Sequence, residues 1–185
     1  LPMAERVCRA AVHARLNLMS GFTTIRDMGT EGADLADVGV KSAIAKKVIP
    51  GPEMLVTTRA IVATGSYAPR SFAPEWRIRQ GAEEADGDRL REVVRRQIRA
   101  GADWIKVYAS TGIADDLTGN QTVSHDEMKA IIDTAHAAGK KVAVHSYGPD
   151  AARDAISLGA DTLEHATDMD DATIADRQSA LDRVF

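Results

Sequence analysis

Short apolar runs rich in β-branched and aromatic residues alternate along the chain with longer segments whose apolar residues recur every three or four positions. The first pattern is typical of buried β-strands and the second of amphipathic helices. Glycine and proline stand at most of the boundaries, where they favour turns and helix ends. The pattern predicts strands at residues 22–27, 53–64, 104–108, 142–145 and 162–166, and helices at 3–19, 33–48, 88–100, 124–138, 149–158 and 171–184.

Strands that alternate with helices across short connections indicate a parallel sheet with crossover helices. The strands after the first are apolar at successive positions, as expected when both faces of a sheet are covered. A complete eight-unit β/α barrel needs about 250 residues, whereas this chain has 185. We therefore expect an α/β fold in which residues 1–185 form a single domain, the middle portion of a (β/α)8 TIM-type barrel with about five parallel strands and outer helices.

One connection is much longer than the others. It runs from about residue 66 to residue 86 and contains two prolines, Trp76 and several charged residues. Loops of this length in compact enzymes often bind ligands or close over a site. We interpret it as a binding loop or lid, with a simple surface excursion as the alternative.

Composition narrows the classes of function. The formal net charge of −4, from 23 basic and 27 acidic side chains, gives no reason to expect a nucleic-acid partner. The arginine-rich segment 89–99 is interpreted as the solvated face of one helix, with a polyanion site as the alternative. Cys8 is the only cysteine, so neither an internal disulfide nor a cysteine metal cluster can form.

Two kinds of sequence signal bear on the location of the protein. No apolar run approaches the roughly 18 residues of a membrane span, and no signal peptide is visible. We therefore expect a cytoplasmic protein without a membrane partner. The chain begins at Leu1 rather than methionine, which is compatible with a processed, engineered or partial product.

Three successive strands carry residues that can bind a metal ion. Lys106, His145 and His165 stand at or near the C-terminal ends of predicted strands, where β/α barrels hold their functional groups. Burying an unpaired ammonium is costly, so Lys106 must be paired, deprotonated or chemically modified. Neutral imidazoles are common ligands of zinc and similar ions. Together the three residues favour a metal site, and a set of hydrogen-bonded core residues is the alternative.

The other histidines are assigned no role in the site. His125 follows Ser124, which forms a capping box with Glu127, so it belongs to the solvated first turn of a helix. His13 and His136 lie on helices, which form the outer ring of a barrel.

Two carboxylates near strand ends are interpreted structurally. Asp27 ends a strand and could reach the site, but we expect it to cap the following turn. Glu164 alternates with His165 along a strand and should point away from it.

Four segments together resemble one known family. They are GFTTIRDMG at 21–29, GADWIKV at 101–107, VAVH at 142–145 and GADTLEH at 159–165. In this order they resemble the amidohydrolase superfamily, and most of all its imidazolonepropionase-like and Xaa-Pro-dipeptidase-like branch. The resemblance runs from about residue 10 to residue 170 and is specific as a set.

The resemblance implies roles for individual residues. In such enzymes the lysine of the fourth barrel strand is carboxylated by carbon dioxide and bridges two divalent metal ions, usually zinc. Histidines that end the next two strands are further ligands. Carried over, Lys106 would be the bridging carbamate, with His145 and His165 as metal ligands. Tyr147 resembles a tyrosine that holds the carboxylate of the substrate in some dipeptidase-like members, and packing at the barrel mouth is the alternative.

The sequence also departs from the family pattern. Where related enzymes have a Thr-Gly-Gly-His-Gly turn, residues 64–68 read Thr-Gly-Ser-Tyr-Ala, so Tyr67 replaces a histidine. The family's first strand carries a His-x-His pair and its eighth an aspartate that acts as general base, and neither is present. We therefore expect this chain alone to bind metal weakly, and the catalytic base is unassigned. In the complete enzyme the metal would acidify water and polarise the scissile carbonyl, while the aspartate moved the proton.

The resulting prediction is a metal-dependent hydrolase of carbon–nitrogen bonds in small amide or peptide substrates, of the dipeptidase or carboxypeptidase kind. One alternative is a lyase or aldolase in which Lys106 forms a Schiff base with a carbonyl substrate. The other is a non-catalytic, truncated barrel segment. In each case the open strand edges need a cover, which a homo-oligomer would provide.

Overall fold

The computed structural model describes residues 1–181 except 68–71, 74, 77–79 and 112–117, and residues 182–185 also lie outside the described part. Within it, strands and helices follow one another along the chain. The strands are β1 (Thr24–Asp27), β2 (Glu53–Val56), β3 (Ile61–Val62), β4 (Glu83–Glu84), β5 (Trp104–Tyr108), β6 (Lys141–Ser146) and β7 (Thr162–His165). The helices are α1 (Met3–Met19), α2 (Ala36–Ala45), α3 (Arg89–Ala100), α4 (His125–Ala137), α5 (Pro149–Ser157) and α6 (Asp171–Leu181).

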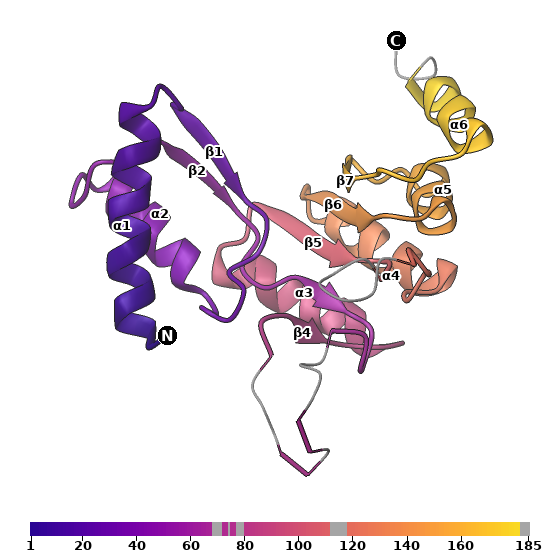
Figure 1. Cartoon of the computed structure of the whole chain (residues 1–185), viewed down its shortest axis with the longest axis horizontal. Coiled ribbons are helices and arrows are strands. Elements are labelled where there is room, and N and C mark those ends of the chain that lie inside the picture. Colours follow the sequence, from indigo (N-terminus) through magenta and orange to yellow (C-terminus); the bar gives the residue numbers. More distant parts are fainter. Residues whose placement is uncertain (68–71, 74, 77–79, 112–117, 182–185) are drawn as a thin grey trace.

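All strand pairs in the described part of the chain are parallel. One sheet has the order β4-β3-β5-β6-β7, and β1 and β2 form a second, two-stranded sheet. Figure 1 shows the two sheets with their helices as an open arc, with α1 and α2 at one end and α5 and α6 at the other. The expected α/β fold, part of a TIM-type barrel with parallel strands and helices, is confirmed.

The strand expected at 53–64 is broken in the structure. Residues 57–60 interrupt it, and Thr58 has a φ of 63°, which a β-branched residue adopts only where its surroundings hold it. The amide of Thr58 donates to Oδ2 of buried Asp37 at 2.7 Å. Before the break β2 pairs with β1, and after it β3 pairs with β5 and β4. The short strand β4 is an addition within the region expected to be a loop, 66–86.

Helix ends follow local backbone chemistry. The helix expected at 33–48 is shorter, because Asp34 and Lys47 have positive φ angles of 49° and 59° that helical residues do not adopt. The capping box is confirmed: the Ser124 amide donates to Oε2 of Glu127 at 3.0 Å, and the Glu127 amide donates to the Ser124 hydroxyl.

No helix in the described residues has both the length and the apolar character that crossing a membrane requires.

The main core lies between the sheet and α3, α4 and α5. Ile105 and Val107 are fully buried in it, so Lys106, which alternates with them along β5, faces the opposite side of the sheet. The apolar residues of α3 and α4 that complete this core include Leu90, Val93, Val94, Met128, Ile131 and Ile132. The strand pattern thus separates an apolar side under the helices from a side that can carry polar groups.

Two aspartates bind neighbouring strands in the same way. The Asp103 amide donates to the Val56 carbonyl oxygen at 2.8 Å, and the Val56 amide donates to the Asp103 carboxylate at 2.9 Å. In the same way, the Asp161 amide donates to the Val142 carbonyl oxygen at 3.0 Å, and the Val142 amide donates to the Asp161 carboxylate at 2.8 Å. Both aspartates end a Gly-Ala-Asp sequence that leads from a helix into a strand. We call these two arrangements the aspartate clamps. One joins the entry of β5 to the end of β2 in the other sheet, and the other joins the entry of β7 to β6, its neighbour in the same sheet.

Candidate metal and substrate site

The side of the sheet away from α3 and α4 contains a cavity of about 530 Å³. Lys106 on β5, His145 on β6, His165 on β7 and Tyr147 just after β6 all line it. These are the four residues that the sequence predicts for the site. The cavity also contains side chains for which the sequence analysis predicts no role in the site, namely Glu31, Tyr67, Tyr108 and Glu164.

Strand register brings most of these side chains together. Tyr108 is paired with His145, and His145 with Glu164, so the three side chains leave the same face of the sheet. Lys106 lies two residues before Tyr108 and therefore projects from that face as well. Parallel, in-register strands thus place polar side chains of β5, β6 and β7 in the same cavity.

His165 reaches the cavity through its backbone conformation. Its partner in the sheet is Ser146, so simple alternation would place it on the opposite face from Glu164. The φ angles of His165 and Ala166 are 70° and 50°, which ends the extended conformation. The centroids of the His165 and His145 rings are 4.7 Å apart. The expectation that Glu164 points away from His165 is wrong, because the alternation stops at His165 and both residues line the cavity.

Lys106 is removed from water without gaining a hydrogen bond. Lys106 as a whole is 2% exposed, and its Nζ has no hydrogen-bond partner among the described residues. Burial lowers the pKa of the Lys106 amine to about 8, with the Glu164 carboxylate opposing the change and the Arg26 guanidinium adding to it. An amine with this pKa is neutral in roughly a tenth of molecules at pH 7, and this fraction can act as a nucleophile.

The two histidines are held in the neutral state. Burial, followed by the nearby His165 and Lys106, lowers the pKa of His145 to about 4. Nε2 of His145 is buried and has no hydrogen-bond partner among the described residues. Burial and Lys106 also lower the pKa of His165, against the opposing effect of Glu164. Neutral imidazoles have a free nitrogen lone pair that can bind a metal ion.

The chemistry of these donors fits a divalent metal ion. Nζ of Lys106 and Nε2 of His145 are buried polar atoms without a hydrogen-bond partner in the described part of the chain, and such atoms call for a specific explanation. In the described ranges of the chain, no group of three or more histidine, cysteine, aspartate or glutamate side chains is arranged to hold a metal ion. This cluster contributes two histidines, and its lysine becomes a ligand only when it is deprotonated or carboxylated.

All three tyrosines of the chain line the cavity. The ring of Tyr147 stacks on His165, with centroids 5.2 Å apart and planes inclined by 7°. The Tyr147 amide donates to the hydroxyl of Ser110 at 2.9 Å, which positions the residue at the end of β6. Tyr67 and Tyr108 form an edge-to-face pair with centroids 5.3 Å apart.

Both of these tyrosines contact one carboxylate. The hydroxyls of Tyr67 and Tyr108 donate to Oε2 and Oε1 of Glu31. The spacing of Lys106 and Tyr108 on one strand is the sequence signal that could have placed Tyr108 in the site. Nothing in the sequence marks Glu31, because its place depends on the fold of the loop between β1 and α2.

The remaining candidate residues lie elsewhere. Nδ1 of His125 contacts the Asp154 carboxylate at 3.0 Å, and Nε2 of His136 contacts a carboxylate at the entry of β7 at 2.9 Å. His13 is exposed on α1. Oδ1 of Asp27 accepts the Gly29 amide at 3.0 Å, so this carboxylate caps the turn after β1 as expected.

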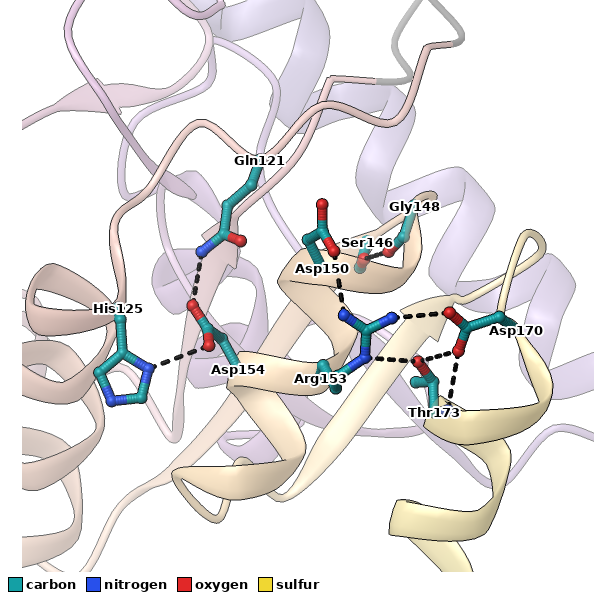
Figure 2. A network of polar contacts seen from close by, with 9 residues as sticks. All are labelled: Gln121, His125, Ser146, Gly148, Asp150, Arg153, Asp154, Asp170 and Thr173. Atoms are coloured by element: carbon teal, nitrogen blue, oxygen red, sulfur yellow. Dashed lines mark hydrogen bonds and ion pairs between the residues drawn. The ribbon is translucent and has the colours of Figure 1, made fainter.

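A polar network holds the elements that follow His145. In Figure 2, Arg153 on α5 reaches Asp170 at 2.6 Å and Thr173 on α6 at 3.3 Å. The hydroxyl of Ser146, the last residue of β6, donates to the Gly148 carbonyl oxygen at 2.7 Å. These contacts join the end of β6 to α5 and α5 to α6, and they thereby support the segment that carries His145 and Tyr147.

Comparison with known proteins gives consistent results at the level of sequence and fold. Residues 4–177 match the amidohydrolase family. Ochratoxinase of Aspergillus niger is 30% identical over 172 residues, which cover 83% of this chain and 35% of that protein. A prolidase solved with N-methylphosphonate-L-proline superimposes with a TM-score of 0.85 at 29% identity, over 97% of this chain and 46% of the prolidase. A Xaa-Pro dipeptidase with methionine bound in its active site has a TM-score of 0.84 at 28% identity, over 94% of this chain and 44% of the dipeptidase.

The similarity covers this chain almost completely and its relatives only in part. The chain spans about a third of the length of ochratoxinase and less than half of the two solved peptidases. The matched part contains Lys106, His145, His165 and Tyr147.

Proposed function

Because the chain belongs to the amidohydrolase family, we propose that the complete protein is a metal-dependent hydrolase of carbon–nitrogen bonds in small amides or peptides. The observation that carries the proposal is a buried lysine amine that has no hydrogen-bond partner among the described residues and lies beside two neutral histidines in one cavity. The names of the relatives, which include a prolidase, a Xaa-Pro dipeptidase and ochratoxinase, support substrates of this class. We further propose a dipeptidase or carboxypeptidase type of specificity.

Lys106, His145 and His165 are the residues that would hold the ion, and zinc is the proposed metal. We propose that the neutral Lys106 amine attacks carbon dioxide, so that a nitrogen–carbon bond forms and the amine proton leaves to solvent. The resulting carbamate would be an anion with oxygen donors, and the burial of Lys106 without a hydrogen-bond partner among the described residues supports this proposal. When bound, a divalent ion of this kind polarises a carbonyl group and increases the acidity of water.

Other residues of the cavity would orient the substrate. The Tyr147 hydroxyl would hold the carboxylate of a peptide substrate. Glu164 is held by the Thr162 hydroxyl at 2.8 Å and by Arg26 at 3.3 Å, and Glu31 is held by two tyrosines. Because both carboxylates of the cavity already accept hydrogen bonds, we assign no catalytic base within this chain.

Elemental metal analysis of the purified chain tests the site. In buffer that contains zinc, we expect weak zinc binding by the wild-type chain and its loss in Lys106→Ala and in His145→Ala, because each substitution removes a proposed ligand. His125→Ala is the matched control, since His125 is an exposed histidine outside the cavity, and it should retain the wild-type metal content. Absence of metal from the wild-type chain after equilibration with zinc, or equal metal content in all four proteins, would refute the metal site.

The carbamate has its own test. We expect carbon-13 NMR of the chain incubated with labelled bicarbonate and zinc to show a carbamate signal that Lys106→Ala lacks. A metal-loaded chain without this signal would leave the histidine ligands in place and reject carboxylation of Lys106.

A second candidate function is a Schiff-base lyase or aldolase. The observation that favours it is the lowered pKa of the Lys106 amine, about 8, because a neutral buried amine attacks carbonyl compounds readily. Borohydride reduction in the presence of pyruvate or glycolaldehyde would then attach the substrate to Lys106, as mass spectrometry of the digested chain would show. Labelling of Lys106 in a metal-free chain would favour this function over hydrolysis.

A further inference from the structure

The cavity contains a carboxylate that the proposed metal site does not use. Glu31 lies in the loop between β1 and α2, and its two oxygens accept hydrogen bonds from the hydroxyls of Tyr67 and Tyr108. Both partners are neutral, and in the described part of the chain no cationic side chain forms an ion pair with the Glu31 carboxylate. The residue is exposed, so a ligand in the cavity can reach this negative charge.

The position of Glu31 depends on close backbone packing. A Cβ at Gly81 would lie 3.2 Å from Oε2 of Glu31 and 3.3 Å from its Cα, so only glycine fits there without a shift. Gly29 has a φ of 141°, and a Cβ on it would lie 3.4 Å from the Tyr108 hydroxyl oxygen. Arg6 donates to the Glu31 carbonyl oxygen at 2.7 Å, and Glu31 itself has a φ of 47°. Contacts from separate parts of the chain therefore fix this residue.

Aromatic rings connect Glu31 to the proposed metal ligands. The ring centroids of Tyr67 and Tyr108 are 5.3 Å apart, those of Tyr108 and His145 are 5.2 Å apart, and those of His145 and Tyr147 are 5.2 Å apart. The faces of tyrosine rings attract organic cations. One wall of the cavity is thus aromatic along its length, with a negative charge at the end formed by Tyr67 and Tyr108.

Glu164, the other carboxylate of the cavity, differs from Glu31 in its partners. It forms an ion pair with Arg26 at 3.3 Å and lies in the field of Lys106. Its charge is therefore offset by an ion pair, whereas the Glu31 carboxylate forms no ion pair with a described residue, and Arg6 contacts the main-chain carbonyl oxygen of Glu31 instead. A fixed carboxylate beside tyrosine rings is an arrangement that recognises an ammonium or guanidinium group.

We propose that Glu31, Tyr67 and Tyr108 form a subsite for an organic cation, which selects substrates that carry an ammonium or guanidinium group. The assignment of this ligand as a substrate rests on the proposed hydrolase function. The α-ammonium group of a peptide and the side-chain ammonium of a lysine residue present the same chemistry to the subsite. The subsite thus lies at one end of the cavity, with the scissile bond at Lys106, His145 and His165.

Calorimetric titration with small amines and their neutral counterparts tests the proposal. L-leucinol and isohexanol differ by an α-ammonium group, and pentylamine and pentanol differ by a terminal ammonium group. With the chain as purified at neutral pH, we expect at least one amine to bind roughly tenfold more tightly than its neutral counterpart. The pair that shows the preference identifies the source of the cation. None of the four probes contains an amide bond, so binding is measured without turnover.

The variant Glu31→Gln removes the charge while its amide group can still contact both tyrosines. In this variant we expect the amine and its neutral counterpart to bind with about equal affinity. Glu53→Gln, which neutralises an exposed carboxylate on β2, is the matched control and should keep the wild-type preference. Tyr67→Phe, which keeps the ring and removes one hydrogen bond to Glu31, should reduce the preference, and it tests the subsite even if Glu31→Gln does not fold.

Three outcomes would overturn the proposal. They are equal binding of amine and neutral counterpart to the wild-type chain, no measurable binding of either amine, and a preference that persists in folded Glu31→Gln. The result is separable from the metal analysis. A chain without metal can still bind amines at Glu31, and a zinc-loaded chain can fail to discriminate between the probes.

Discussion

Lys106 and Asp37 are ionisable side chains that the fold removes almost completely from water, with exposed fractions of 2% and 4%. Burial disfavours the charged form of each, so the pKa of the Lys106 amine falls to about 8 and the pKa of the Asp37 carboxyl rises to about 6. Asp37 accepts hydrogen bonds from the amides of Thr58 and Val38 at 2.7 Å and 2.8 Å. These bonds limit the rise without cancelling it, and they hold the break between β2 and β3.

The raised pKa of Asp37 predicts a pH dependence of stability. The usual value of 3.8 lies below the folded-state value of about 6, so the folded chain binds this proton more tightly than the unfolded chain does. The contribution to the free energy of unfolding therefore increases as pH falls through 6 and is complete near 3.8. From pH 7.5 to pH 4, we expect the stability of the wild-type chain relative to Asp37→Asn to rise by at most about 3 kcal/mol. Urea unfolding at each pH measures this difference, and a difference that does not change with pH would contradict the prediction.

At the scale of elements, the two aspartate clamps have the same pattern of hydrogen bonds at the entries of two different strands. Asp103 also binds Nζ of Lys41 on α2, at 2.5 Å and 2.6 Å from its two oxygens. Asp161 contacts Nε2 of His136 on α4 at 2.9 Å. Each carboxylate therefore links a strand entry, a second strand and a helix. This repetition agrees with a barrel built from equivalent units.

We expect removal of either clamp to destabilise the chain. Asp103→Ala and Asp161→Ala each leave a strand amide without its acceptor, so each should lower the free energy of unfolding by about 1–3 kcal/mol. Asp133→Ala is the control, because it removes an exposed partner of Lys129 on α4 and should change the free energy by about 0.5 kcal/mol or less. Denaturant unfolding measures all three variants. Equal effects in the clamp variants and the control would show that the clamps add nothing to stability.

At the scale of the whole molecule, the arc is open and exposes apolar residues. Val12, Leu16 and Met19 follow helical spacing on one side of α1 and are 58%, 52% and 70% exposed. Among the described residues, β7 pairs only with β6, and β1 only with β2. Exposed strand edges and apolar helix faces favour association.

We expect the isolated chain to self-associate in solution. Light scattering coupled to size-exclusion chromatography should show a mean mass that rises with protein concentration. The double variant Val12→Glu, Leu16→Lys places charges on the exposed side of α1 and should lower the mean mass. Lys129→Glu, Asp133→Lys introduces the same charges on α4 as a control and should behave like the wild-type chain. A monomer at every concentration would contradict the prediction.

Metal content separates the remaining interpretations of the chain. Zinc bound at Lys106 and His145 would support a hydrolase, and labelling of Lys106 by a carbonyl compound would support a lyase. A chain that binds no metal and forms no Schiff base would match the non-catalytic barrel segment.

The sequence by itself determined the architecture and the strand faces of two proposed ligands, Lys106 and His145. Alternating strands and helices with short connections allow few arrangements other than a parallel sheet, because handedness and chain length restrict the crossovers. Lys106 and His145 follow from the same pattern. A polar residue that alternates with buried apolar residues must leave the opposite face of its strand. These conclusions depend on local periodicity, which the sequence shows directly.

Only the tertiary structure decided the details that complete the cavity. The break at Thr58 depends on an acceptor 21 positions away, Asp37. His165 and Glu164 share the cavity because the backbone turns at a positive φ, and the contact of Glu31 with Tyr67 and Tyr108 joins residues separated by 36 and 77 positions. Such contacts depend on how loops fold against strands. No periodic pattern encodes them, because each results from the packing of segments that are distant in the chain.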